Sequence, residues 1–120
     1  MQLKNKTIAI LIADGVEDLE YYVPMMRLQE DGAKVLSAAM DLKPVTGKNG
    51  LIITPTTTIE SLKANDLSAL ILPGGWSPDK IRRYDVVKNI VKEINNANKI
   101  IGIICHGGSI AISAGIIKKG

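Results

Sequence analysis

Four short apolar runs, separated by segments with helical periodicity, most strongly constrain how this chain can fold. The runs are rich in β-branched residues and cover residues 8–13, 33–40, 67–72 and 99–105. Each is almost continuously apolar rather than alternating, which is typical of strands covered on both faces. Strands that alternate with helices predict a parallel sheet with helices on both faces. The sequence therefore predicts an α/β fold.

The first expected helix covers residues 17–31. A capping-box spacing at residues 14–17 precedes it, and Gly32 is a natural stop after it. The helical period places four apolar residues near one side of this helix, and they are Leu19, Val23, Met26 and Leu28.

Two more helices and a peripheral strand are expected. Residues 79–96 form one helix, whose apolar stripe consists of Val87, Ile90, Val91 and Ile94. Residues 109–117 form another, which is apolar nearly all round and is therefore expected to be central. Residues 51–58 carry Thr and Pro and predict a more exposed strand or hairpin.

Composition fits one domain over residues 1–120. Hydrophobic residues make up 46% of the chain and Phe is absent, so the core must be built from aliphatic side chains and Met. The net charge of +3 is spread along the chain without a basic stripe, which argues against nucleic-acid binding. No leader precedes the first strand, and no apolar run approaches the roughly 18 residues of a membrane span. We expect a cytoplasmic protein without membrane partners.

Cys105 follows an apolar run and precedes His106, two glycines and a helical segment. A buried strand fixes where the side chain emerges, and the glycines permit a tight turn. Free N–H groups at the start of the next helix favour a thiolate over a thiol. This order resembles the nucleophile elbow of α/β-hydrolases, with sulfur in place of oxygen. The alternative is a small buried cysteine, but such a residue does not need this turn, so we predict a nucleophile.

Partners for this thiol are less strongly indicated. His106, the only histidine, either lines the turn or acts as a base or orienting partner. Because Cys105 is the only cysteine and no Cys/His set has metal-ligand spacing, we expect no disulfide, metal or other cofactor.

Two further groups of residues are expected at the carboxyl edge of the sheet, where ligands bind in open α/β folds. Gly74 and Gly75 either offer N–H groups to an oxyanion or form an ordinary loop, and Trp76 either lines a pocket or covers that loop. The acidic residues in 14–20 are expected to be mostly a solvated helix start. Glu20 is the exception: Pro24 cannot donate to its carbonyl, and a disturbed turn can direct its carboxyl toward the thiolate.

Several motifs together resemble those of the ThiJ/PfpI superfamily, specifically its PfpI-like intracellular protease branch. They are Asp14-Gly-Val-Glu-Asp-Leu-Glu20 with Pro24, Thr46-Gly47 with Gly50, Leu72-Pro-Gly-Gly75 with Pro78-Asp79, and Ile104-Cys-His-Gly107 with Ile112-Ser-Ala-Gly115. The resemblance implies a flavodoxin-like three-layer α/β/α sandwich with a mostly parallel sheet, related to class I glutamine amidotransferase domains. Since relatives continue with further strands and a final helix, residues 1–120 are expected to be a single domain that lacks this C-terminal part.

The resemblance also implies roles for individual residues. Cys105 corresponds to the family nucleophile, Glu20 to the carboxyl that hydrogen-bonds it, and His106 to the histidine after it. Gly75 corresponds to the oxyanion-hole glycine. Asp79 falls where an acidic residue, usually Glu, reaches a histidine of a neighbouring subunit. The remaining expected oxyanion and substrate-binding residues are Gly74, Gly107 and Trp76. The family forms dimers and its PfpI branch forms hexamers, so we expect a homodimer or homohexamer.

Activities ascribed to the family are peptide hydrolysis of the C56 peptidase type, glyoxalase conversion of methylglyoxal to lactate, and deglycation of amines and thiols. All of them begin with thiolate attack on a carbonyl. We therefore predict a PfpI-like cysteine-nucleophile enzyme that acts on small carbonyl or peptide substrates. The alternatives are a non-catalytic redox-sensing or chaperone-like stress protein, whose thiol oxidises to sulfinic acid, and an inactive truncated remnant.

Overall fold

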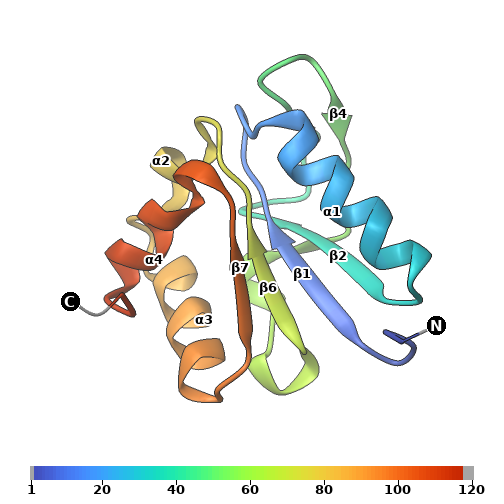
Figure 1. Ribbon diagram of the computed structural model, residues 1–120. Helices are drawn as coiled ribbons and strands as arrows, with labels where there is room; N and C mark the ends of the chain where they lie inside the picture. The colour runs from blue at the N-terminus through green and yellow to red at the C-terminus, as the bar shows by residue number, and fades with distance from the viewer. Residues whose placement is uncertain (1, 118–120) are drawn as a thin grey trace.

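A parallel β-sheet with helices on both faces forms the computed structural model, which describes residues 2–117 (Figure 1). Within that range the sheet has the strand order β5-β2-β1-β6-β7, and every neighbouring pair is parallel. The four apolar runs each contain one of its main strands, so the expected α/β class and parallel sheet are confirmed. These strands are β1 (Thr7–Leu11), β2 (Lys34–Ala39), β6 (Ala69–Leu72) and β7 (Ile100–Ile103).

The helices divide between the two faces of the sheet (Figure 1). Helix α1 (Asp18–Glu30) lies on one face and contacts β2. The opposite face is covered by α3 (Asp85–Asn96) together with α2 (Ser77–Ile81) and α4 (Gly108–Ala114). Short 3-10 turns cover Ile59–Ser61, Ala64–Asp66 and Cys105–Gly107.

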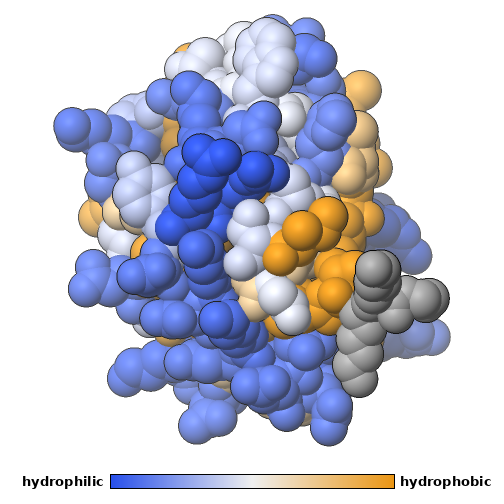
Figure 2. Space-filling model, turned by 90° about the vertical axis from the view of Figure 1, so that its left-hand side faces the viewer, coloured by the Kyte–Doolittle hydropathy of each residue, from blue (hydrophilic) through white to orange (hydrophobic). Residues whose placement is uncertain are grey.

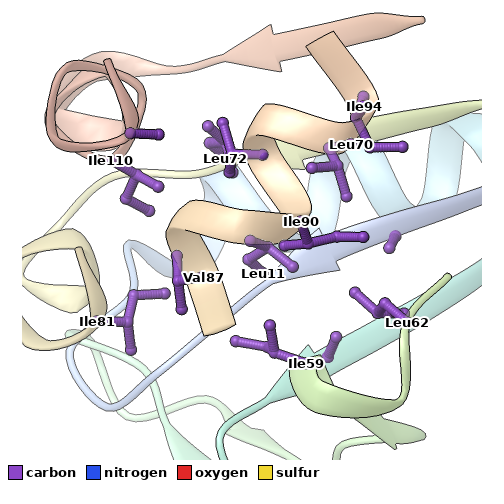
Figure 3. Close-up of a cluster of buried hydrophobic side chains, with 14 of the residues drawn as sticks. Leu11, Ile59, Leu62, Leu70, Leu72, Ile81, Val87, Ile90, Ile94 and Ile110 are labelled. Carbon is purple, nitrogen blue, oxygen red and sulfur yellow. The ribbon is translucent and has the colours of Figure 1, made fainter. Parts of the chain in front are cut away.

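Side chains of β1 alternate between two apolar clusters. Ala9 and Leu11 point into the larger cluster, while Ile10 points into the cluster beneath α1. The larger cluster lies between the sheet and the second layer of helices (Figure 3). Its members include Leu70, Leu72, Ile81, Val87, Ile90, Val91, Ile94 and Ile110. The apolar stripe predicted for the helix over residues 79–96 is thus confirmed as core.

The apolar side predicted for the first helix is wrong for three of its four residues. Leu19, Val23 and Met26 are exposed, whereas Leu28 packs against the core, and Tyr21 is the buried residue of α1. The Tyr21 hydroxyl hydrogen-bonds Ser37 Oγ at 2.7 Å inside the protein. Tyr21, Met25 and Leu28 have the same helical spacing as the exposed set, so periodicity alone permits either side. The side of α1 that faces the sheet is the one that carries Tyr21, because its hydroxyl has a hydrogen-bond partner in Ser37 when it is buried.

The capping box predicted at residues 14–17 is also absent. Helix α1 has Glu17 at its N-cap, and no side chain there caps the helix. Asp14 instead accepts a hydrogen bond from the Thr46 N–H at 2.9 Å. The acidic residue therefore binds a neighbouring segment of the chain rather than the helix that follows it.

The single helix predicted over residues 79–96 is two helices. They are separated by a turn at residues 82–84, where Tyr84 is extended with φ −72° and ψ 133°. Ile81 and Val87 are both buried in the larger cluster. In one continuous helix, residues six apart point in directions that differ by about 120°. The turn allows both side chains to enter the same core.

The last strand and helix are less covered than their sequences predict. β7 is an edge strand within the described residues, and Ile100 and Ile103 are exposed. The last helix is not central, because only one side of α4 packs inward, while Ile112 is 66% exposed. Figure 2 shows a patch of apolar side chains on the surface, on the side of the molecule where α2, α3 and α4 lie. The sequences of β7 and α4 are almost wholly apolar, yet each of these elements has one exposed face within the described residues.

Residues 51–58 form the peripheral structure that their composition predicts. β4 (Ile52–Ile53) pairs antiparallel with β3 (Val45–Thr46) in a separate hairpin. β5 (Thr57–Thr58) joins the edge of the main sheet beside β2.

Among residues 2–117, no helix is both long and apolar enough to cross the membrane.

Two isoleucines of α4 test the division between core and surface. Ile110→Ala removes a fully buried side chain and should lower the free energy of unfolding by about 2–5 kcal/mol. Ile112→Ala on the exposed side of the same helix should change it by no more than about 0.5 kcal/mol. Urea denaturation followed by circular dichroism measures both. Equal losses would contradict the orientation of α4.

Candidate active site

Cys105 lies on a strained turn between β7 and α4. Its φ of 50° places it in the left-handed region, which residues with a Cβ rarely occupy. Such strain costs of order 1–3 kcal/mol and is concentrated at functional sites. The thiol-bearing residue is exposed, and the chain passes through the 3-10 turn Cys105–Gly107 directly into α4. The structure therefore has the strand, turn and helix in the order that a nucleophile elbow requires.

Backbone contacts with the end of β6 hold this turn in place. Ile104 N–H donates to the Leu72 carbonyl at 3.1 Å. Gly107 packs so closely that a Cβ on it would collide with the same carbonyl oxygen. The residue after the histidine must therefore be glycine for reasons of space, which gives Gly107 a structural role beside the site.

Glu20 reaches the same point from α1. Its Oε1 accepts a hydrogen bond from the Gly74 N–H at 2.8 Å. A Cβ on Gly74 would lie 2.7 Å from Glu20 Oε1, 3.1 Å from Cys105 Cβ and 2.9 Å from the backbone nitrogen of His106. The structure thus brings Glu20, Gly74 and the Cys105 turn together. Three segments that are distant in the sequence meet at one glycine.

The contact made by Glu20 differs from the expected one. Its carboxyl hydrogen-bonds the Gly74 N–H, and within residues 2–117 no hydrogen bond joins it to the Cys105 thiol. Helix α1 also continues through Pro24 without a break. The carboxyl is directed to this site by the Gly74 amide, and not by a disturbed helical turn.

The two glycines after β6 have different environments. Gly74 N–H is occupied by Glu20, so it is not free to face an oxyanion. Gly75 has a φ of 79°, and a Cβ on it would collide with the Gly15 carbonyl oxygen. Its N–H donates to no acceptor among the residues that the structure describes. Of the two, Gly75 is the one with an unused donor.

His106 and Asp79 are placed differently from the residues around Gly74. The His106 backbone is next to Gly74, while its imidazole is exposed and makes no hydrogen bond within the described part of the chain. Asp79 lies in α2, with its Oδ1 3.9 Å from Arg82 Nη1 in an exposed ion pair. Such pairs contribute little to stability. The structure does not bring Asp79 into the Cys105 cluster.

Trp76 is 58% exposed and packs over Gly15. The backbone N–H of Trp76 donates to the Gly15 carbonyl at 2.8 Å. This hydrogen bond lies beside the β-bridge between Val16 and Gly75. Lys48 Nζ lies 5.2 Å from the centre of the Trp76 ring, within the range of a cation–π interaction. Sequence reasoning did not single out Lys48. Its only local signal was the Gly-rich turn around it.

The residues described contain no group of three or more His, Cys, Asp or Glu side chains placed to hold a metal ion. The chemistry that the site offers is that of an exposed thiol beside a carboxyl group and a free backbone N–H. Fold and site together define a class of protein: a parallel α/β domain with a cysteine on a strained strand-to-helix turn.

The chain belongs to the DJ-1/PfpI family, whose sequence model matches residues 6–120. A deglycase of Pyrococcus abyssi is 36% identical over 111 residues, which cover 92% of this chain and 67% of that protein. YraA of Bacillus subtilis, whose name proposes a cysteine protease, is 35% identical over 115 residues, covering 95% and 68%. The family resemblance noted from the motifs is confirmed.

A solved structure agrees with the fold. A two-domain protein of Anabaena variabilis, with DJ-1/ThiJ/PfpI-like and ferritin-like domains, has a TM-score of 0.92 and 30% identity; the match covers 95% of this chain and 33% of that one. The flavodoxin-like three-layer arrangement expected from the motifs is therefore confirmed. The chain spans about two thirds of the length of the curated relatives that it matches.

Substitutions of two adjacent glycines test the close packing of Gly107 against the Leu72 carbonyl. Gly107→Ala should lower the free energy of unfolding by about 2–4 kcal/mol, because its Cβ would meet the Leu72 carbonyl. Gly108→Ala is the control: Gly108 has helical φ and ψ of −59° and −25°, and the nearest atom, on Ile103, is 3.5 Å away. It should be neutral or stabilising by about 0.5–1 kcal/mol. Thermal and urea denaturation of both variants measure the difference, and similar losses would contradict the packing.

Proposed function

We propose that this chain carries the catalytic centre of a cytosolic cysteine enzyme that attacks carbonyl groups, with small methylglyoxal-type adducts as its first class of substrate. The observation that carries the proposal is the meeting of Cys105, Glu20 and Gly74 on a strained turn. Relatives named as deglycases, including protein/nucleic acid deglycase 2 of Escherichia coli, support deglycation. YraA supports peptide hydrolysis as the second candidate.

The proposed first step forms a bond between Cys105 Sγ and the substrate carbonyl carbon. The carbonyl π electrons move onto oxygen and give a tetrahedral oxyanion. The Gly75 N–H, which has no acceptor in the described part of the chain, is the donor we assign to that oxyanion. The exposure of Cys105 gives a substrate access to the sulfur.

On a peptide carbonyl, collapse of the adduct expels the protonated amine, and water hydrolyses the resulting thioester to the acid and the free thiol. On the aldehyde of methylglyoxal, released when the amine or thiol of the adduct departs, the oxyanion is protonated to a hemithioacetal. A proton shift from that carbon to the neighbouring ketone carbon then gives a lactoyl thioester, which water hydrolyses to lactate and the free thiol.

Glu20 is proposed to transfer a proton beside the thiol. One of its oxygens is held by the Gly74 N–H, which fixes the orientation of the carboxyl and leaves the second oxygen available. His106 is proposed as an exposed orienting or proton-transfer group. Asp79 is proposed to act only across a subunit interface, because within one subunit it is exposed and paired with Arg82.

The catalytic roles predict distinct losses for two substitutions. Cys105→Ser should lower the rate of hemithioacetal or hemiaminal breakdown at least about 10³-fold, since the nucleophile is lost. Glu20→Gln should lower it about 10²-fold. The Gln amide oxygen can still accept from the Gly74 N–H, so the fold is retained and proton transfer alone is removed.

These rates are measured with methylglyoxal adducts of N-acetylcysteine and N-acetylarginine, and with a casein peptide for proteolysis. Circular dichroism shows whether each variant is folded. Undiminished turnover by Cys105→Ser would overturn the proposed nucleophile. Selective oxidation of Cys105 by dilute peroxide, together with no turnover by the unmodified protein, would favour the non-catalytic redox-sensing alternative.

We further propose that the chain forms a homo-oligomer through the outer side of α1. Leu19, Val23 and Met26 are exposed at helical spacing on one side of that helix, and contiguous exposed apolar surface is typical of interaction sites. A second copy is the partner that the family resemblance implies. Charge introduced within this surface should therefore separate the subunits.

Val23→Glu should shift the species measured by size-exclusion chromatography with light scattering toward the monomer, because association would bury an unpaired carboxylate. Asn95→Glu adds the same charge on the exposed side of α3, which covers the opposite face of the sheet, and is the control. An unchanged oligomer in Val23→Glu, or the same shift in Asn95→Glu, would contradict this interface.

A further inference from the structure

The turn of the β3–β4 hairpin is held by carboxyl groups at the start of α1. Asp18 Oδ1 accepts from the Asn49 N–H at 3.1 Å, and its Oδ2 accepts from the Leu51 N–H at 3.0 Å. Asp14 Oδ1 accepts from the Thr46 N–H. Gly47 lies so close to Asp18 that a Cβ there would collide with the carboxylate. The hairpin is therefore fixed against α1 by specific contacts on both sides of its turn.

Lys48 lies at the tip of this fixed turn. Its own N–H donates to the Val16 carbonyl at 2.8 Å, which places its backbone beside the segment that pairs with Gly75. The neighbouring Asn49 donates its side-chain amide to both oxygens of Glu17, at 3.1 and 3.3 Å. The backbone position of Lys48 is thus fixed by the hydrogen bonds of the hairpin turn.

The ammonium group of Lys48 is not paired with a carboxylate. Within residues 2–117 the one ion pair is that of Arg82 with Asp79, and the acidic groups nearest to the hairpin are occupied by N–H donors. Lys48 Nζ instead lies over the Trp76 ring. An ammonium has three donors and no acceptor, so the side turned away from the ring is free to bind an anion.

Trp76 belongs to the same loop as Gly74, which lies beside the Cys105 turn. It is two residues from Gly74, so the two Cα atoms are no more than about 7.6 Å apart. Gly74 is the residue around which Glu20 and Cys105 meet. The segments that converge here cover residues 12–20, 45–51, 73–77 and 104–109, and Lys48 is their only Lys or Arg. Within these four segments, Lys48 is therefore the one cationic side chain beside the acidic residues that follow β1.

We propose that Lys48 is a specificity-determining residue that binds a carboxylate on the substrate, and that the preferred substrates are small carbonyl compounds bearing a carboxylate close to the reactive carbon. The proposal rests on the proposed nucleophilic role of Cys105. The Trp76 ring orients the ammonium and covers the apolar part of the substrate. A charge-assisted hydrogen bond from Lys48 to the carboxylate then aligns the carbonyl with the sulfur.

Two alkylating reagents of nearly equal size test this without requiring turnover. Iodoacetate and iodoacetamide both react with the Cys105 thiolate by forming an S–C bond and releasing iodide, and they differ in that iodoacetate is an anion. Their rate constants are measured by mass spectrometry in each variant. The ratio of the two rates cancels any change in the reactivity of the thiol itself.

Lys48→Gln should lower the iodoacetate-to-iodoacetamide ratio about fivefold at low ionic strength, and added salt should reduce the ratio of the unmodified protein toward that of the variant. Lys48→Arg keeps the charge and should keep the ratio. Lys92→Gln, on the exposed side of α3, changes the net charge equally and should leave the ratio within twofold. An unchanged ratio in Lys48→Gln, or the same fall in Lys92→Gln, would overturn the proposal.

Turnover supplies the second measurement. In Lys48→Gln, the KM for the methylglyoxal adduct of N-acetylcysteine, which carries a carboxylate, should rise about fivefold, while the KM for the neutral adduct of N-acetylcysteine amide should stay within twofold. Equal changes for both substrates would contradict a carboxylate site. If the alkylation ratio falls but the unmodified protein turns over neither substrate, the anion site stands and the proposed enzymatic function fails.

Discussion

The hydrogen bond from the Gly74 N–H to Glu20 Oε1 is the interaction on which the candidate site depends. It joins α1 to the loop after β6, which leads to α2 on the opposite face of the sheet (Figure 1). A half-buried carboxyl needs donors, since leaving it unpaired would cost free energy. The same glycine leaves no space for a side chain between Glu20 and Cys105. The carboxyl and the thiol are therefore brought together by a single peptide group.

Close backbone packing explains how the Cys105 turn remains strained. A left-handed residue with a Cβ persists only where its surroundings over-determine it. Here the turn is fixed before the cysteine by the hydrogen bond between Ile104 and Leu72, and after it by the contact of Gly107 with the same carbonyl. One peptide group at the end of β6 thus restrains both sides of Cys105. Contacts with β6 therefore hold the backbone of Cys105 rigid although its side chain is exposed.

Much of the fold was predictable because continuous apolar runs leave a chain few alternatives to a buried parallel sheet. The orientation of α1 was not, because two sets of residues with equal helical spacing compete for the core. The outcome depends on the hydrogen bond between Tyr21 and Ser37, which periodicity does not contain. The break at residues 82–84 likewise follows from burying both Ile81 and Val87. Both errors concern tertiary partners. The capping box at residues 14–17 and the disturbed turn at Pro24 are local predictions that were also wrong.

The acidic residues after β1 show the same limit at the candidate site. Their sequence is typical of a solvated helix start, and only the fold reveals that Asp14 and Asp18 bind backbone N–H groups some 30 residues away. Because these carboxylates hold the hairpin, they also decide where Lys48 lies. The charge at the rim of a cysteine site is thus set by residues that never contact the thiol. In this chain, the hydrogen bonds from the hairpin backbone to Asp14 and Asp18 bring a basic side chain to an acidic segment.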